Sequence, residues 1–172
     1  MIAIHPQAQG GRSSWQIVLF SALIFWLSSC LLIDGVVMPS MYVSGLMEQA
    51  GFATAGYSLF WVFNRVELVC AGLILTVVLS LAYLRHPWNR PGTFATLLAV
   101  GLLAIAMIDT YGLSPQMGAL GLQLDWLSAQ VPVVAEMNRL HLEYWGLDLL
   151  KMAIVGTLLW RYLRPSFPVS QM

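Results

Sequence analysis

The chain has 172 residues, of which 59% are hydrophobic and 9% are charged, whereas soluble domains average about 25% charged residues. Eight basic and eight acidic side chains balance to a net charge of zero. This composition excludes a disordered chain, a nucleic-acid-binding protein with a basic surface and nearly every soluble globular domain. Two cysteines, both within apolar runs, exclude a disulfide scaffold and a cysteine-based zinc site. The class that remains is an integral membrane protein of one domain.

Four apolar stretches are each long enough to cross a bilayer as a helix of about 20 residues. They lie at about 16–37, 57–84, 93–111 and 137–163. Backbone polar groups inside a bilayer must be satisfied within the segment, and the short alternating strands of a barrel are missing, so we predict helices. The predicted fold is all-α: an integral membrane protein whose four transmembrane helices form an up-down bundle.

The basic residues near the ends of the spans predict the orientation. They are Arg12, Arg85, Arg90, Arg161 and Arg164, whereas the connections 38–56 and 112–136 contain neither Lys nor Arg. The positive-inside rule therefore places both termini and the turn 85–92 in the cytoplasm and both connections outside. Within the second connection we expect a short amphipathic helix along the membrane surface over 118–136, or a loop packed on the bundle. The expected location is a bacterial plasma membrane, with a thylakoid or other internal membrane as alternatives.

Ionisable residues inside membrane spans are costly, so they are the first candidates for a functional site. The candidates for a ligand or ion pocket lie in the external half of the spans or near their middle: Asp34, Asn64, Arg65, Glu67, Asp109, His141, Glu143, Asp148 and Lys151. Within the spans, five acids face three bases when Arg139 is included. Pairing leaves two acids over, and these should be protonated, hydrated or bound to a cation.

Helical spacing predicts which of these residues pair. Asn64 shares a face of the second helix with Glu67, whereas Arg65 points away from it and needs a partner on another helix. The candidate partners of Arg65 are Asp34, Glu143 and Asp148. The pairs expected along the fourth helix are Arg139 with Glu143 and Asp148 with Lys151. His141 and Asp148 are seven residues apart and are expected to share a face.

Several functions fit this pattern, and a structural network that fixes helix register is the plainest of them. A non-enzymatic protein that binds or passes a small cation, proton or solute would use Asp34 and Glu67 as acceptors, Arg65 as their counter-charge, and His141 with Asp148 as a titrating or ligating pair. An accessory or assembly subunit of a larger membrane complex is the second hypothesis. A cofactor protein with His141 as the axial ligand of a haem or chlorophyll is the third.

Neither a metal site nor an enzyme has a strong motif in this chain. A metal would fall on His141 or on Met38 and Met41, whose thioethers suit Cu(I), although methionine is mostly apolar filler in membrane proteins. No phosphate loop, nucleophile elbow or zinc-protease motif occurs, so we expect no enzymatic activity and no cofactor. The expected partners are the lipid bilayer and other membrane subunits or a second copy of the chain, and not nucleic acid.

Two stretches of the chain resemble a family of four-helix membrane proteins, domain of unknown function 4149, which is related to the transmembrane protein 205 group. The first stretch comprises Asp34-Gly35-Val36-Val37-Met38-Pro39-Ser40-Met41-Tyr42, then Ala50-Gly51 and Leu59-Phe60. The second is Met137-Asn138-Arg139-Leu140-His141, followed by Asp148. The resemblance implies a shared four-helix topology, and it implies no particular reaction.

Overall fold

The computed structural model describes residues 14–46, 49, 51–83, 92–126 and 131–163. Its helices are α1 (Ser14–Leu32), α2 (Met38–Val43), α3 (Phe52–Tyr83), α4 (Thr93–Ile108), α5 (Ser114–Trp126) and α6 (Val131–Leu163). A π-helical turn at Ile33–Val37 joins α1 to α2, and a second one at Asp109–Leu113 joins α4 to α5. The described residues contain no strand, which confirms the all-α prediction.

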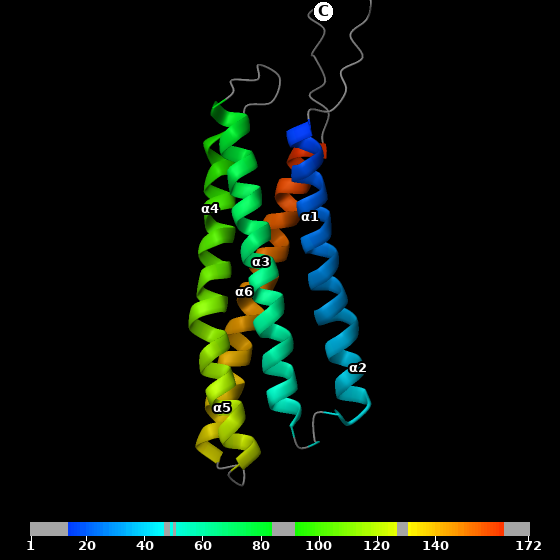
Figure 1. Cartoon of the computed structure of the whole chain (residues 1–172), viewed down its shortest axis with the longest axis vertical. Helices are drawn as coiled ribbons and strands as arrows, with labels where there is room; N and C mark the ends of the chain where they lie inside the picture. Colours follow the sequence, from blue (N-terminus) through cyan, green and yellow to red (C-terminus); the bar gives the residue numbers. More distant parts are fainter. Residues whose placement is uncertain (1–13, 47–48, 50, 84–91, 127–130, 164–172) are drawn as a thin grey trace, which may run out of the picture.

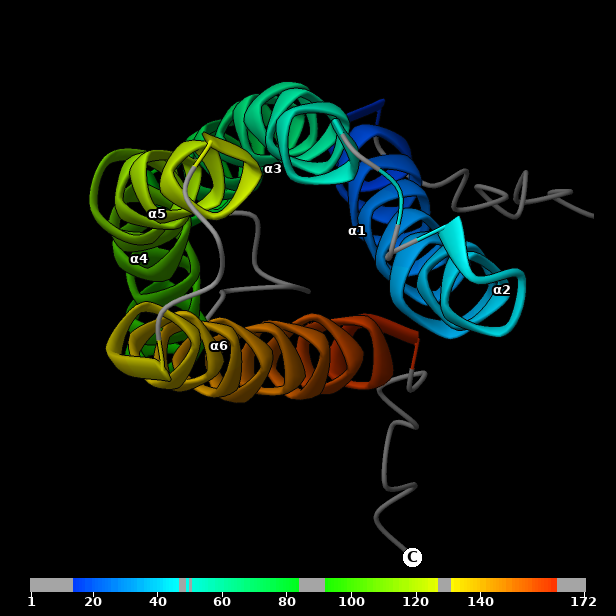
Figure 2. The same ribbon diagram turned by 90° about the horizontal axis from the view of Figure 1, so that it is seen from below.

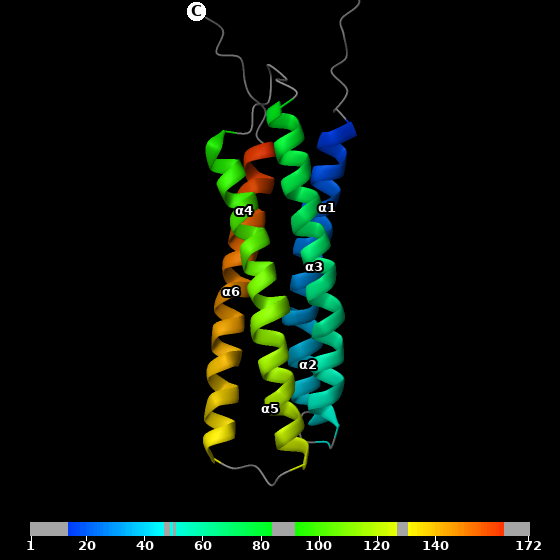
Figure 3. The same cartoon turned by 60° about the vertical axis from the view of Figure 1, so that its left-hand side comes forward.

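The helices form four long rods, because α2 continues the line of α1 and α5 continues the line of α4 (Figure 1). Neighbouring rods are antiparallel, so the first residue of α1 and the last residue of α6 lie at the same end of the bundle (Figure 3). Seen along its length, α3 lies between α1 and the α4–α5 rod (Figure 2). The α6 rod contacts α4, α5 and α1. The chain therefore forms an up-and-down bundle of four rods.

Three of the rods are long and apolar enough to cross a membrane, over Ser14–Val43, Thr54–Ala82 and Thr93–Leu122. Their outward faces are as apolar as their inward faces: Phe25 on α1 and Val69 on α3 are 54% and 70% exposed. A helix that is apolar all round is typical of a membrane span. The fourth rod, α6, differs because ionisable residues are distributed along it.

The helices extend beyond the predicted spans, so the predicted connections 38–56 and 112–136 are largely helical. Both predictions for 118–136, a surface helix and a loop packed on the bundle, are wrong, because α5 prolongs α4 and α6 starts at Val131. The sequence suggested that the spans end at Pro39 and Pro115, since proline lacks the N–H of a helical hydrogen bond and its ring clashes with the preceding turn. Each proline instead follows a π-helical turn by two residues, and this wider turn lets the helix continue.

The buried apolar residues form two separate clusters along the bundle. The larger one fills the half that contains the first residue of α1, and its members include Leu23, Ile74, Leu102 and Leu158. The smaller one, in the other half, consists of Leu113, Leu140 and Tyr144 with partly buried neighbours. The buried polar side chains lie between these clusters, about midway along the rods.

Candidate functional site

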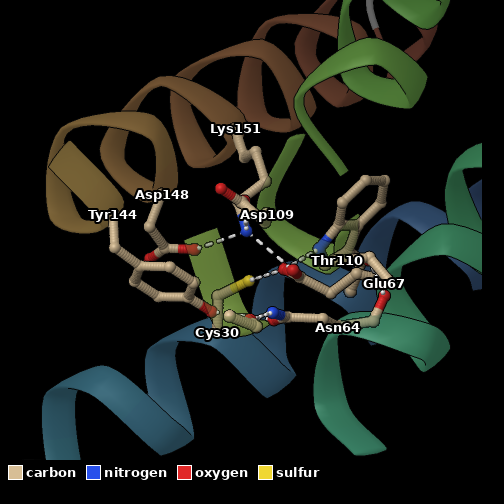
Figure 4. Close-up of polar contacts among 10 residues, drawn as sticks. Cys30, Asn64, Glu67, Asp109, Thr110, Tyr144, Asp148 and Lys151 are labelled. Carbon is tan, nitrogen blue, oxygen red and sulfur yellow. Dashed lines mark hydrogen bonds and ion pairs between the residues drawn. The ribbon is translucent and has the colours of Figure 1, made fainter. Parts of the chain in front are cut away.

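One ammonium group is surrounded by three carboxylates in the interior of the bundle (Figure 4). Lys151 Nζ lies 2.6 Å from Glu67 Oε2, 2.9 Å from Asp109 Oδ2 and 3.2 Å from Asp148 Oδ1. Lys151 and Asp109 are 0% exposed, Glu67 is 1% exposed and Asp148 is 4% exposed. We call Glu67, Asp109, Asp148 and Lys151 the acid–lysine cluster.

Three rods supply the acid–lysine cluster, each from near its midpoint. Glu67 lies halfway along α3, and Asp109 opens the π-helical turn between α4 and α5. Asp148 and Lys151 are three residues apart on α6 and form the ion pair predicted from that spacing. The four residues were all among the predicted site residues, and the structure brings them together.

Two residues of α1 contact the second oxygen of Glu67. Trp26 Nε1 donates a hydrogen bond of 2.7 Å to Glu67 Oε1, and Cys30 Sγ lies 3.4 Å from the same oxygen. Trp26 and Cys30 are four residues apart, so they share the inner face of α1. Both were missed at the sequence level, because an indole and a thiol inside an apolar run look like packing residues. Glu67 thereby links α3 to both α1 and α6.

A second polar network, centred on Asn64, lies next to the acid–lysine cluster (Figure 4). Tyr144 donates its hydroxyl hydrogen to Asn64 Oδ1 at 2.9 Å, and Asn64 Nδ2 donates to Ser114 Oγ. Thr110 Oγ1 donates to the backbone oxygen of Asn64 at 3.3 Å. Asn64 precedes Glu67 by three residues, so the predicted shared face of α3 is confirmed. The network ties α3 to α6 and to the α4–α5 rod.

The acid–lysine cluster has more carboxylates than cations. With every group ionised, three carboxylates and one ammonium carry a net charge of −2. Neither oxygen of Asp109 accepts a hydrogen bond from the described residues, so the ion pair with Lys151 is its one polar contact there. Buried charge is costly unless it is paired and hydrogen-bonded. The cluster is therefore able to accept further positive charge.

Asp34 is a fourth acid, at the edge of this arrangement. It is half-buried in the π-helical turn that joins α1 to α2, and its carboxyl group interacts with that of Asp148. Its Oδ2 atom is buried without a hydrogen-bond partner among the described residues. The backbone of this turn approaches α1 and α2 and packs against none of the other described helices. Asp34 thus lies beside the inner acids, in a turn whose backbone only α1 and α2 approach among the described helices.

The structure places Arg65 apart from the acid–lysine cluster. Arg65 Nη1 donates to the carbonyl oxygen of Trp61 at 2.9 Å, and the guanidinium carbon lies 3.5 Å from the centre of the Trp61 ring. The partner predicted for Arg65 on another helix is therefore replaced by a residue one turn away on α3. Arg65 was predicted to be the counter-charge of the buried acids, but Lys151 is the cation that pairs with them.

His141 and Glu143 are exposed on α6 and are also outside the cluster. His141 Nδ1 lies 2.9 Å from the carbonyl oxygen of Met137, and Glu143 forms the predicted ion pair with Arg139 at 3.2 Å. His141 is exposed whereas Asp148 is buried, so the expectation that the two residues share a face is wrong.

The atoms that could hold a metal ion differ from those predicted. Met38 and Met41 lie partly exposed on α2. Among the described residues, the group with metal-ligand spacing consists of Cys30, Glu67 and Asp148, which offer one sulfur and two carboxylate oxygens within 4.8 Å of one another. Both cysteines are free thiols, as predicted.

No protein-family model, curated protein or solved structure matches the chain. The fold and the site nevertheless define a class: a helical bundle with three rods apolar enough to cross a membrane and a buried acid–lysine cluster about midway along them.

Proposed function

We propose that this protein spans a membrane with all four rods and binds or passes a small cation, the proton included, at the acid–lysine cluster. The observation that carries the proposal is the convergence of three buried carboxylates on a single buried ammonium. Intramembrane ionisable residues that face a bundle interior are typical of ion and proton pathways. Asp34, which is half-buried beside Asp148, would receive the cation, and the three inner acids would hold it.

The exposed charges of α6 support a position for the bilayer. The helix is about 50 Å long, whereas the hydrocarbon core of a bilayer is about 30 Å thick. Arg139, His141 and Glu143 are exposed in its first half, where contact with lipid tails would be costly. We therefore place the second half of α6 in the bilayer and let the first half extend outside. The acid–lysine cluster then lies toward the outer side of the membrane.

The proposed orientation has both chain ends in the cytoplasm. Arg12, Arg85, Arg90 and Arg164, which favour it by the positive-inside rule, lie outside the described residues. The common end of the first and last rods agrees with an even number of crossings (Figure 1). We still predict that the protein is located in a bacterial plasma membrane. Its relationship to domain of unknown function 4149 also remains a prediction.

Reconstitution into liposomes tests the proposal. We expect the wild-type protein to raise proton or alkali-cation flux above that of empty vesicles, and the double variant Asp34→Asn with Glu67→Gln to lower it at least about tenfold. Glu143→Gln is the matched control, because it neutralises an exposed acid on α6 that has no contact with the cluster. If the protein binds an alkali cation without transporting it, the protein should retain that cation on gel filtration. Wild type that neither conducts nor retains a cation, or a double variant that equals wild type, would refute the proposal.

An accessory subunit of a larger membrane complex is the second candidate, and the exposed face of α6 favours it. Arg139 forms ion pairs with Glu136 and Glu143 on this face, and Leu142 beside them is 75% exposed. A mixed charged and apolar surface of this kind suits a protein partner better than lipid tails. Purification in mild detergent distinguishes the two candidates: a stoichiometric partner that is lost in Leu142→Ser supports a subunit, and a monodisperse single chain argues against one.

A further inference from the structure

We propose that Cys30, Glu67 and Asp148 form a binding site for a divalent metal ion of the zinc class. This inference rests on the proposed cation-binding function and names the cation. It replaces the predicted metal ligands His141, Met38 and Met41 with three inward-facing residues from α1, α3 and α6 (Figure 4). It also reverses the exclusion of a zinc site with a cysteine ligand, because two carboxylates join the single thiol in the ligand set.

The geometry of the three side chains is close to that of a zinc site. Their ligand atoms all lie within 4.8 Å of one another, and Cys30 Sγ is 3.4 Å from Glu67 Oε1. Zn–S and Zn–O bonds of about 2.3 and 2.1 Å in a tetrahedron put sulfur and oxygen about 3.6 Å apart. One edge of the tetrahedron is therefore already formed. The other edges need carboxylate movements of about 1 Å, which side-chain rotation supplies.

Buried carboxylate oxygens without hydrogen-bond donors are the independent sign of a cation. Asp109 is 0% exposed, and neither of its oxygens accepts a hydrogen bond from the described residues. Asp148 Oδ1, one of the oxygens facing Lys151, also accepts none there. Buried carboxylates normally have such donors or coordinate metals. Asp109 Oδ1 has neither a hydrogen bond nor an ion pair among the described residues, so the acid–lysine cluster has acceptor capacity that Lys151 does not satisfy.

The charge of the acid–lysine cluster matches a divalent ion. With all groups ionised the cluster carries −2, which one M²⁺ ion neutralises, and binding of Cys30 as a thiolate leaves one negative charge. The proton of the thiol is released on binding. Lys151 would give up its contacts with Glu67 and Asp148 to the metal and keep its ion pair with Asp109, at 2.9 Å. The ammonium therefore retains a partner while the metal is bound.

The mixed ligand set selects the kind of metal. Mg²⁺ and Ca²⁺ prefer sites made of oxygen alone, and Cu(I) prefers several sulfurs, whereas one thiolate with carboxylates suits Zn²⁺ and Co²⁺. The indole of Trp26 donates to Glu67 Oε1 at 2.7 Å and fixes the orientation of that ligand, as second ligand shells do in metalloproteins. Asp34, which is half-buried beside Asp148, offers the route of entry.

Cobalt titration of the purified full-length protein in detergent tests the site. We expect one Co²⁺ per chain, a thiolate-to-cobalt charge-transfer band in the near-ultraviolet, and displacement of the cobalt by Zn²⁺. Cys30→Ser should abolish the band and weaken metal binding at least about tenfold. The matched control is Cys70→Ser, because Cys70 is the other buried thiol and is not part of the metal-ligand group. An unchanged thermal unfolding temperature in both variants shows that they are folded.

A second variant keeps the test independent of folding defects in the first. Asp148→Asn removes a ligand carboxylate, keeps the size of the side chain and relieves part of the surplus negative charge, so it should fold and should weaken Co²⁺ and Zn²⁺ binding at least about tenfold. A band that survives in Cys30→Ser, or one that disappears in Cys70→Ser, would overturn the metal site. If wild type binds no Co²⁺ or Zn²⁺ but still retains or conducts protons or alkali cations, this inference fails and the proposed function stands. If the wild type binds no Co²⁺ or Zn²⁺ and also neither conducts nor retains any other cation, both the metal site and the proposed function are refuted.

Discussion

Lys151 Nζ and Glu67 Oε2 are 2.6 Å apart, although their residues are 84 positions apart in the chain and lie on rods whose backbones do not touch. No Cα atom of α3 lies within 8 Å of one in α6 in the part of the chain that the structure describes. The ion pair therefore crosses the middle of the bundle and joins two diagonally opposite rods. Lys151 is the long side chain that makes this reach possible, and it contacts an acid on each of three rods.

Removal of the ammonium should destabilise the fold strongly. Lys151→Met leaves three buried carboxylates without a counter-charge, and we expect it to lower the free energy of unfolding by about 3–5 kcal/mol. Reversible unfolding in mixed micelles measures the change. The double variant with Glu67→Gln should lose less than the sum of the single variants, because one of the uncompensated charges is gone. Arg139→Met, which breaks two exposed ion pairs, should cost less than about 1 kcal/mol. Equal losses at the two positions would contradict the diagonal ion pair.

The Asn64 network should depend on a single hydroxyl group. Tyr144→Phe removes the donor at 2.9 Å from Asn64 Oδ1 and leaves a buried amide oxygen unsatisfied, so we expect a loss of about 1–3 kcal/mol. Tyr111→Phe is the control, because Tyr111 is 65% exposed and its hydroxyl group is not part of this network. The same unfolding assay applies. A loss that is no larger in Tyr144→Phe than in Tyr111→Phe would show that Asn64 Oδ1 finds another donor.

Much of the site was predictable because helical spacing is a strict rule. Asn64 and Glu67 at i,i+3, and Asp148 and Lys151 at i,i+3, were placed correctly from position alone. Tyr144 was missed, although its spacing of four residues from Asp148 and seven from Lys151 marks the same face of α6. An aromatic residue in an apolar span carries no distinctive signal until its hydroxyl partner on α3 is known.

The remaining errors concern a cation that is satisfied within its own helix and departures from α-helical geometry. Arg65 was given a partner on another helix because an intramembrane cation needs one, but the ring and carbonyl of Trp61 fill that role from the same helix. The ends of the spans were misplaced because Pro39 and Pro115 normally stop helices. A π-helical turn precedes each, and such turns have no clear sequence signature.

Close approach of α3 and α5 depends on Gly118. A Cβ atom added there would lie 2.5 Å from Tyr57 Cδ2, which forces the ring to move. We expect Gly118→Ala to cost about 1–3 kcal/mol by overpacking, and Tyr57→Ala to relieve most of that cost in the double variant. Gly156→Ala is the control, because no atom lies within 4 Å of its added Cβ, and it should be neutral or stabilising by up to about 1 kcal/mol. A Gly118→Ala variant that behaves like Gly156→Ala would contradict the packing.

The proposed orientation predicts opposite accessibility at the two ends of the bundle. Ser44 and Thr93 are exposed and lie at the end of α2 and the start of α4, which are opposite ends (Figure 1). In a background where both native cysteines are serine, a membrane-impermeant maleimide should label Ser44→Cys on intact cells. Thr93→Cys should react only after the membrane is permeabilised, because the proposed orientation puts the start of α4 on the cytoplasmic side. The reverse pattern would invert the topology and place the acid–lysine cluster toward the cytoplasm. Labelling of both positions on intact cells would show that the rods do not cross the bilayer.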